Sequence, residues 1–347
     1  MRFSRMRLPC TLGPAVAAIA VLAMLAIATP ASAAGQDYKG WFVALDLATT
    51  QPNSLDQHFA NHVNNTLAPA PVERLVIDNS TDFTYRASAG YSWGGSLGSL
   101  KVSYWSFDND DKMSDTLPGG VYPTIFGFGY NNLGFYPYNA AGVAFTATSK
   151  VKAQTTDLDY IRPIATSEKN TLSWLAGLRV ASYEEDQGFV AFDGSYYYYQ
   201  DKHIKSDGIG LRVGAAAEFG FTPHFGLVSS AVFSFLQADL EGDSSQHSTA
   251  VGSVLETHHS KDNNIRGEMR DFDVKAVWSY GALDYWVGFS TSSWDGMVAD
   301  PVPGLAGGPL VFGIGPTESR GRDNISFNSL HAGVKWRFGK KSGLPPI

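Results

Sequence analysis

Cysteine is almost absent from this 347-residue chain, and its one cysteine, Cys10, lies among the first 33 residues. That segment has the form of a secretory signal: three arginines, an apolar run over residues 15–28, and the small-residue motif Ala31–Ala33. We expect cleavage before Ala34. The mature chain would then contain no cysteine, which excludes disulfides and thiol chemistry.

Long hydrophobic runs are absent after the signal. A spanning helix needs about 20 mostly apolar residues. The charge-free stretch 116–149 is long enough, but Gly, Pro and Asn recur throughout it and would break a helix. If the mature protein lies in a membrane, only a closed β-barrel can satisfy its backbone polar groups.

An excess of positive charge is also absent. Removal of the signal leaves 23 basic residues against 33 acidic ones, a formal charge of −10. This balance argues against a nucleic-acid partner, which needs a basic face. The mean hydropathy of −0.12 resembles that of a soluble protein, as expected when half of each barrel strand faces water.

The chain is instead rich in glycine, with 36 residues, and in aromatic side chains, with 21 Phe, 16 Tyr and 8 Trp. Glycine permits bends at barrel corners, and Tyr and Trp favour the membrane interface. The segment His331–Phe338 shows the matching pattern: Val334, Trp336 and Phe338 alternate with Lys335 and Arg337. Successive strand side chains point to opposite faces, so this strand has an apolar face and a wet, cationic face.

The same alternation recurs along the chain and predicts about ten strands, with eight or twelve as alternatives. The predicted strands are 40–50, 83–93, 100–108, 150–161, 172–183, 209–221, 225–237, 268–280, 283–294 and 325–338. Residues 189–203 are expected to extend strand pairing above the membrane surface. Long loops, among them 109–149, 239–266 and 295–322, alternate with short turns.

Such segregation of loops is typical of bacterial outer-membrane barrels. We therefore predict an all-β, antiparallel transmembrane barrel over residues 34–338, after a signal peptide 1–33 and before a tail 339–347. A periplasmic or secreted β-protein is the alternative, although a soluble sandwich gives no reason for this loop pattern.

Charged residues on the wet faces of these strands are the candidate pore lining. They would set ion selectivity in a water-filled lumen, or pair with one another and plug a narrow barrel. The candidates are Arg86, Arg179, Arg212, Glu218, Asp271, Asp273, Lys335 and Arg337, and Asp46 and Asp284 also lie on wet faces. We expect charge reversal at Arg86 or Arg212 to alter ion preference more than folding.

Three stretches, Trp41–Leu47, 155–186 and 207–242, carry spaced Gly, Arg and aromatic positions. They are similar to the pore-forming outer-membrane proteins typified by the Legionella major outer membrane protein. The resemblance implies passive diffusion of ions or small hydrophilic solutes across the outer membrane of a Gram-negative bacterium. The rival function is a non-conducting structural or adhesive barrel that displays loops.

The end of the last predicted strand also resembles a barrel-assembly signal, formed here by His331, Gly333, Trp336 and Phe338. That signal usually ends the chain, whereas residues 339–347 follow it here. The expected partners are outer-membrane lipid, the assembly machinery, small solutes or ions, and a second copy of the chain. No cofactor and no nucleic acid are expected.

Enzymatic and metal sites have weaker support. Gly94–Gly98 matches G-x-S-x-G but joins two predicted strands, so a tight turn is the better interpretation. Asp186, His203 and Asp295 could meet at a barrel rim, but their spacing identifies no catalytic set. One polar loop carries four groups that could meet over a metal, although nothing fixes their geometry: His247, Glu256, His258 and His259.

The loop around Phe126–Tyr138 is aromatic and glycine-rich. It could fold into the lumen as a constriction, form a contact surface at the rim, or simply cover its own apolar residues. The chain alone does not choose among the three.

Overall fold

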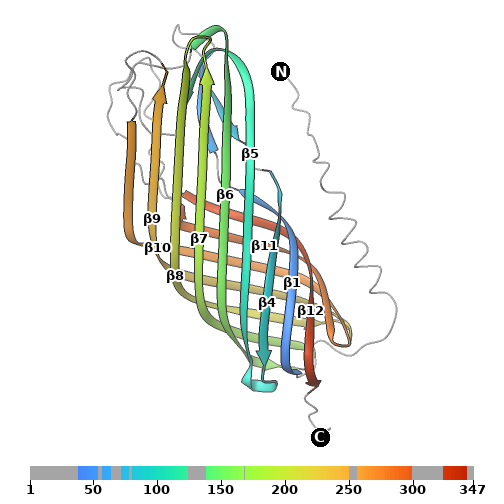
Figure 1. Ribbon diagram of the computed structural model, residues 1–347. Helices are drawn as coiled ribbons and strands as arrows, with labels where there is room; N and C mark the ends of the chain where they lie inside the picture. The colour runs from blue at the N-terminus through green and yellow to red at the C-terminus, as the bar shows by residue number, and fades with distance from the viewer. Residues whose placement is uncertain are drawn as a thin grey trace.

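The fold is a closed antiparallel barrel of ten strands, seen in a computed structural model (Figure 1). The structure describes residues 38–53, 57–63, 72–77, 80–123, 138–167, 169–249, 256–298 and 323–341. The predicted signal peptide and most of the aromatic loop lie outside these residues, as does the loop 299–322. Among the described residues, no helix is long and apolar enough to span a membrane.

Ten strands form the ring, in the order β5-β4-β1-β12-β11-β10-β9-β8-β7-β6, and pairing of β5 with β6 closes it. Their bounds are β1 Tyr38–Asn53, β4 Asp82–Ser92, β5 Ser99–Pro123, β6 Tyr138–Thr166, β7 Asn170–Phe192, β8 Tyr197–Gly220, β9 Phe225–Ser248, β10 Glu256–Tyr280, β11 Leu283–Val298 and β12 Asp323–Lys341. The predicted fold class and strand number are confirmed. β1 and β12, the first and last strands in the sequence, pair with each other.

Two further strands, β2 (Gln57–Val63) and β3 (Val72–Ile77), form a hairpin within the predicted loop after β1. β2 pairs with the far end of β5, where Ala60 lies opposite Pro123. Leu75 and Ile77 of β3 are buried in an apolar cluster with residues of β6, β7 and β8. The hairpin therefore extends the barrel beyond its ring at the end away from the short turns.

The connections at one end of the ring are all short, whereas the other end carries the long connections and one short turn, residues 193–196 between β7 and β8. A 3-10 turn, Gly95–Leu97, joins β4 to β5, and a turn at Gly281 joins β10 to β11. Gly94 and Gly98 have φ of 79° and 78°, a backbone conformation that favours glycine. The G-x-S-x-G match is thus a tight turn between strands, as expected. Since periplasmic turns are short in bacterial barrels, we assign this end to the periplasm.

The strands differ in height. β5 to β10 are 23 to 29 residues long, whereas β1, β4, β11 and β12 have 11 to 19. In Figure 1 the long strands rise as a wall above the rest of the ring. We call the part of β5–β10 beyond the short strands the tall wall.

Lipid-facing side chains cover the lower ring. Leu211 is 63% exposed, Phe235 56% and Trp336 52%. Apolar side chains of this size are more stable in contact with hydrocarbon than with water. Aromatic pairs mark the periplasmic edge, where Trp41 packs edge-on against Tyr91 at 5.2 Å between ring centroids. These residues form the apolar belt of a membrane-spanning barrel.

Two predicted loops are wrong. β5 continues to Pro123 and β6 begins at Tyr138, so most of the predicted loop 109–149 is strand. β9 and β10 likewise occupy most of 239–266. The cause is a change of phase: in the tall wall, charged side chains gather on the outer face and most inward-facing side chains are apolar, so the pattern of the membrane part does not continue. Glu185, Gln187, Gln200 and Lys202 are buried polar exceptions. Residues 189–203 do extend strand pairing upward, as predicted.

Candidate channel lining

Charged side chains from eight strands meet inside the lower barrel in three clusters. In the first, Arg179 of β7 donates from Nε and Nη2 to the two carboxylate oxygens of Asp157 on β6, at 2.7 and 2.9 Å. Its Nη1 lies 2.7 Å from Asp271 on β10. The bidentate geometry makes the Arg179–Asp157 pair a strong one.

Arg212 of β8 joins the same cluster. Its Nη1 lies 2.6 Å from Asp157 and 2.9 Å from Asp159, and its Nη2 lies 3.5 Å from Asp271. Lys101 of β5 completes the cluster, 3.6 Å from Asp159. Only 2% of the Arg179 side chain and 6% of the Arg212 side chain are exposed, so these charges are held away from bulk water by their partners.

The second cluster centres on His331 of β12. Its Nδ1 lies 2.9 Å from Asp46 on β1, and its Nε2 lies 3.2 Å from Asp273 on β10. Trp286 donates its indole N–H to Asp46 at 3.1 Å. His331 therefore connects β12 to its neighbour β1 and, past β11, to β10.

The third cluster lies at the periplasmic mouth. Arg337 donates to Asp284 at 2.9 Å and to the backbone oxygen of Gly281 at 3.2 Å. Nearby, the ammonium of Lys335 lies 4.6 Å from the ring centroid of Phe42.

A chamber of about 1040 Å³ runs through these clusters. It reaches from the β4–β5 turn at Gly94 up to Trp105 and Phe327. Seven of the eight residues predicted to line a pore line this chamber: Arg86, Arg212, Glu218, Asp271, Asp273, Lys335 and Arg337. Arg179, the eighth, is not in the lining and is buried between Asp157 and Asp271.

Arg86 differs from the other arginines. It lies opposite Asp46 in the β1–β4 register, yet no hydrogen bond or ion pair joins it to any residue in the described ranges. Its side chain is half-buried on the chamber wall. Arg86 is thus a cation available to whatever occupies the chamber.

Above the chamber an apolar layer fills the lumen. Its members are Trp105, Phe107, Tyr183, Met269, Trp294 and Phe327, and at most 8% of any of them is exposed. Tyr183 of β7 and Trp294 of β11 lie on nearly opposite sides of the ring, and their ring centroids are 6.5 Å apart. Side chains therefore meet across the whole width of the barrel at this level.

The layer and the first ion cluster are in contact. Trp294 donates its indole N–H to Ser292 at 2.9 Å, and Ser292 donates to Asp271 at 2.6 Å. Arg179 lies 3.7 Å from the sulfur of Met269. Movement of the aromatic rings would therefore disturb the charges below them.

Sequence reasoning missed several members of the clusters. Asp157 and Asp159 lie on a strand whose alternation is poor over 150–161, because that range crosses from the membrane part into the tall wall. The alternating acids in Thr155-Thr-Asp-Leu-Asp159 were the available signal. His331 was assigned only to the assembly signal, since its lumenal partners come from β1 and β10.

The other residues of the predicted assembly signal have identifiable places. Trp336 and Phe338 face lipid and pack together, with ring centroids 4.5 Å apart. Gly333 lies against Trp286, where a Cβ would come within 2.3 Å of the indole. Recognition by the assembly machinery stays a prediction.

Of the four groups considered for a metal, only His247 and His259 have side chains among the described residues, and these two have separate partners. His247 stacks on Tyr199 at 4.5 Å, while His259 bonds Asp243 at 2.7 Å. Of the three rim residues, Asp186 and His203 do meet, at 2.6 Å, but Asp295 lies on β11 opposite Glu268. No catalytic set assembles from these residues.

The family model described as the Legionella pneumophila major outer membrane protein precursor matches residues 36–278 of this chain. That description names an outer-membrane protein and no enzyme. A search of curated proteins found no match.

Three solved barrels illustrate the likeness to known structures. The toluene transporter TodX of Pseudomonas putida is 9% identical over 92% of each chain, with a TM-score of 0.34. A Pseudomonas aeruginosa FadL homologue is 7% identical over 87% of this chain and 91% of its own, with a TM-score of 0.22. The transport unit of the Escherichia coli autotransporter AIDA-I is 8% identical over 93% and 98%, also at 0.22. We draw no argument about cargo from likenesses at this level.

Proposed function

The chain belongs to the Legionella major outer membrane protein family and resides in the bacterial outer membrane, and on that premise we propose that its barrel is a channel for ions or small hydrophilic solutes. Passage would be passive and would follow the charged chamber. Nothing in this proposal requires a cofactor.

The observation that carries the proposal is the chamber itself. A volume of about 1040 Å³ has room for on the order of thirty water molecules. Its wall presents carboxylates, guanidinium groups and ammonium groups, and such charges need hydration or a partner. A barrel that served only as a scaffold could fill this space with apolar or small side chains.

The apolar layer sets a condition on conduction. With Trp105, Trp294 and Phe327 in van der Waals contact across the lumen, water has no continuous path at that level. Hydrophobic constrictions can gate channels by excluding water. Conduction therefore requires these rings to move apart, and the described arrangement is a closed one.

The same layer favours the second candidate, a non-conducting barrel that displays its outer loops. In that case the rings form a permanent core, and the charged clusters only hold the strands together. The two functions differ in whether the layer opens under any condition.

Planar-bilayer recording on the refolded mature chain tests the proposal. Wild type is compared with Phe327→Ala and Trp105→Ala/Phe327→Ala, which thin the layer, and with Phe235→Ala, which removes a lipid-facing ring. We expect discrete conductance steps in wild type, larger steps in the layer variants, and wild-type steps in Phe235→Ala.

Two outcomes decide against the channel. If wild type is silent while the layer variants conduct, the native layer is a permanent core and the display function is favoured. If all folded variants are silent, the chamber is not part of any pathway.

A further inference from the structure

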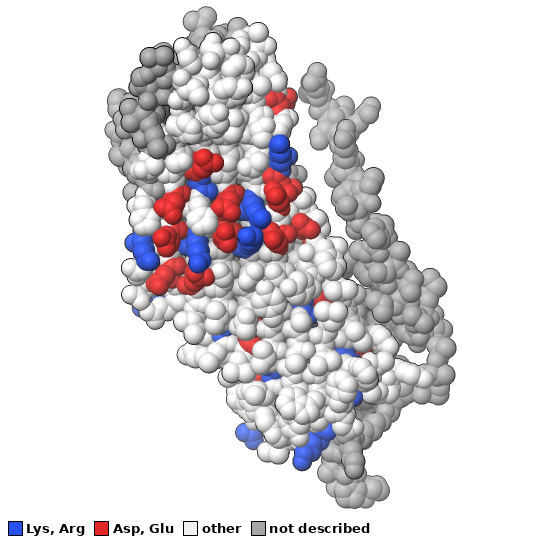
Figure 2. All heavy atoms as spheres, viewed as in Figure 1, with Lys and Arg blue, Asp and Glu red and all other residues white. Residues whose placement is uncertain are grey.

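A belt of charged side chains crosses the outer surface of the tall wall. Register pairing aligns two of its rows across β5 to β10. The first row is Asp108, Lys152, Glu184, Lys205, Glu241 and Lys261, and the second is Asp110, Lys150, Asp186, His203, Asp243 and His259. With Asp207 and Asp239 just below them, these residues are called the charged belt. Figure 2 shows its acidic and basic groups gathered over a largely uncharged surface.

The belt begins where the lipid-facing surface ends. On β8, Leu211 and Ile209 are exposed and apolar, and Asp207, Lys205 and His203 follow on the same face. Neighbouring strands change at the same level, because Ile209 pairs with Val180, Asp207 with Ser182, and Lys205 with Glu184. On β8 the apolar belt runs from Ile209 to Phe219. Because the strand is tilted, this stretch covers a height of about 25 Å, close to the height of a bacterial barrel's apolar band. The charged belt therefore sits at the headgroups of the outer leaflet.

Charges in the first row alternate in sign from strand to strand. Lys261 lies 3.7 Å from Glu241, and Lys152 lies 4.0 Å from Glu184. Lys205 lies 3.1 Å from Asp207, and this hydrogen bond, together with the charge of Asp207, raises the pKa of Lys205. The Lys261–Glu241 and Lys152–Glu184 pairs join neighbouring strands, and such cross-strand pairs help to fix the register of the wall.

Lateral pairing does not neutralise the belt. Its eight carboxylates face four lysines, Lys150, Lys152, Lys205 and Lys261, so acid is in excess. A surface of this kind is compatible with anionic headgroups only if cations lie between them.

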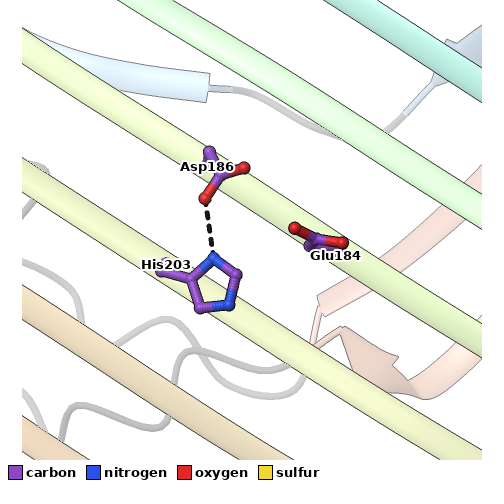
Figure 3. Close-up of side chains that lie close together, drawn as sticks. All are labelled: Glu184, Asp186 and His203. Atoms are coloured by element: carbon purple, nitrogen blue, oxygen red, sulfur yellow. Dashed lines mark hydrogen bonds and ion pairs between the residues drawn. The ribbon is translucent and has the colours of Figure 1, made fainter.

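The excess acid is concentrated in two clusters with the same design. In each, a Glu-x-Asp pair on one strand meets a histidine opposite the Asp on the next: Glu184 and Asp186 with His203, and Glu241 and Asp243 with His259. Figure 3 shows the first cluster, with all three side chains on one face of β7 and β8. One ligand atom from each residue lies within 4.8 Å of the others.

We propose that the charged belt binds the phosphate-bearing headgroups of the outer-leaflet lipid, its lysines contacting phosphate and its carboxylates sharing the divalent cations that accompany it. Two features select this occupant. The belt is continuous with the lipid-facing surface below it, and lysines that extend from a sheet at headgroup level attract anionic lipid. Magnesium and calcium take carboxylate and phosphate oxygens together. The proposal holds whether or not the barrel conducts.

Binding of bisphosphorylated lipid A to the full mature chain in detergent, with magnesium present, tests this. The belt variant Lys152→Gln/Lys205→Gln is compared with Lys39→Gln/Lys169→Gln, which removes two exposed lysines at the periplasmic end. We expect the belt variant to bind roughly tenfold more weakly or worse, and the control to change by less than about twofold. Lys152→Arg/Lys205→Arg should retain wild-type binding.

A separate experiment tests whether divalent cations take part in the binding. EDTA should weaken lipid A binding to wild type, whereas Asp186→Asn/Asp243→Asn should bind weakly with or without magnesium. Heat-modified gel mobility confirms that each variant is folded.

Three results would overturn the proposal. They are equal binding of lipid A that lacks phosphates, an equal loss in the periplasmic control, and binding that ignores both EDTA and the lysine substitutions. A belt variant that changes the mass of the oligomer while lipid binding stays constant would instead assign the surface to a second copy of the chain.

Discussion

The membrane-spanning part and the tall wall are built from the same strands but are sorted in opposite ways. On β8, Leu211 faces outward and Arg212 inward in the membrane part. Higher on the same strand, Lys205 faces outward and Ile204 inward. The interior changes with the exterior. Ion clusters and a chamber lie below, and two apolar clusters lie above, with buried Glu185, Gln187, Gln200 and Lys202 between them.

The difference shows that the surroundings, not the strand, decide which face is apolar. Below, hydrocarbon outside favours apolar side chains there, and charges are confined to the lumen. Above, water outside and a dry interior restore the arrangement of a soluble protein. The apolar layer lies where the dry interior of the wall meets the wet chamber, which is why the closure occurs there.

The upper interior extends well beyond the layer. A second apolar cluster contains Val143, Phe145, Phe189 and Tyr198. Burial, followed by a hydrogen bond to Asp193, raises the pKa of Tyr198, whose hydroxyl donates to that carboxylate at 2.9 Å. The wall therefore has an apolar core of its own.

The largest effect is expected from a charge reversal in the lower interior. Arg212→Glu would leave Asp157, Asp159 and Asp271 without one shared partner and add a fourth carboxylate. A broken buried network of this kind loses about 3–5 kcal/mol. Urea unfolding in lipid vesicles measures the loss, with Lys152→Glu on the wall surface as control, expected to change stability by about 1 kcal/mol or less.

This replaces the sequence-based expectation that reversal at Arg212 changes ion preference more than folding. Arg212 is part of the structure that holds β6, β8 and β10 together. A stable Arg212→Glu barrel would show that the interior cluster is hydrated and flexible.

A smaller loss of stability is expected when a charged side chain is placed on the lipid-facing surface, or an apolar one on the outer face of the tall wall. Val213 faces lipid about midway up the apolar belt, so Val213→Lys should lose about 2–4 kcal/mol in vesicles. Lys205→Leu in the tall wall should change stability by about 1 kcal/mol or less. Equal effects at the two sites would mean that the membrane boundary does not lie between them.

The smallest change in stability, with a clear change in function, is expected at Arg86. Because it has no ion-pair partner among the described residues, Arg86→Glu removes no contact of the clusters. It should shift the barrel toward cation preference, with Arg86→Gln intermediate, as measured by reversal potentials in a salt gradient. If selectivity is identical in all three proteins, solutes do not pass Arg86.

Sequence reasoning succeeded wherever one pattern rule applied from end to end. β1, β4, β11 and β12 stay within the membrane part, and their alternation located each of them to within a few residues. It failed on the upper parts of β5, β6, β9 and β10, whose patterns change phase partway along. The prediction assumed that the apolar face of each strand points outward to lipid. The segment Phe145–Val151 has its apolar face inward, so most of it was predicted to be a loop.

The sequence likewise predicted one part of the site and missed another. The wet-face charges were identified individually, since each interrupts an apolar alternation. Their grouping was not, because Arg179, Asp271 and Asp157 come from three strands and the distances among them depend on how the ring closes. Arg86 and Arg212 look alike in the sequence, and only the structure separates a paired arginine from an unpaired one.

The sequence by itself determined that this protein is an antiparallel outer-membrane barrel of about ten strands, because the two-residue period of a strand records which face meets lipid. The tertiary structure alone decided that aromatic side chains meet across the lumen above a charged chamber. The reason is that Tyr183 and Trp294, more than a hundred residues apart, meet only when the ring brings opposite strands within the reach of two side chains.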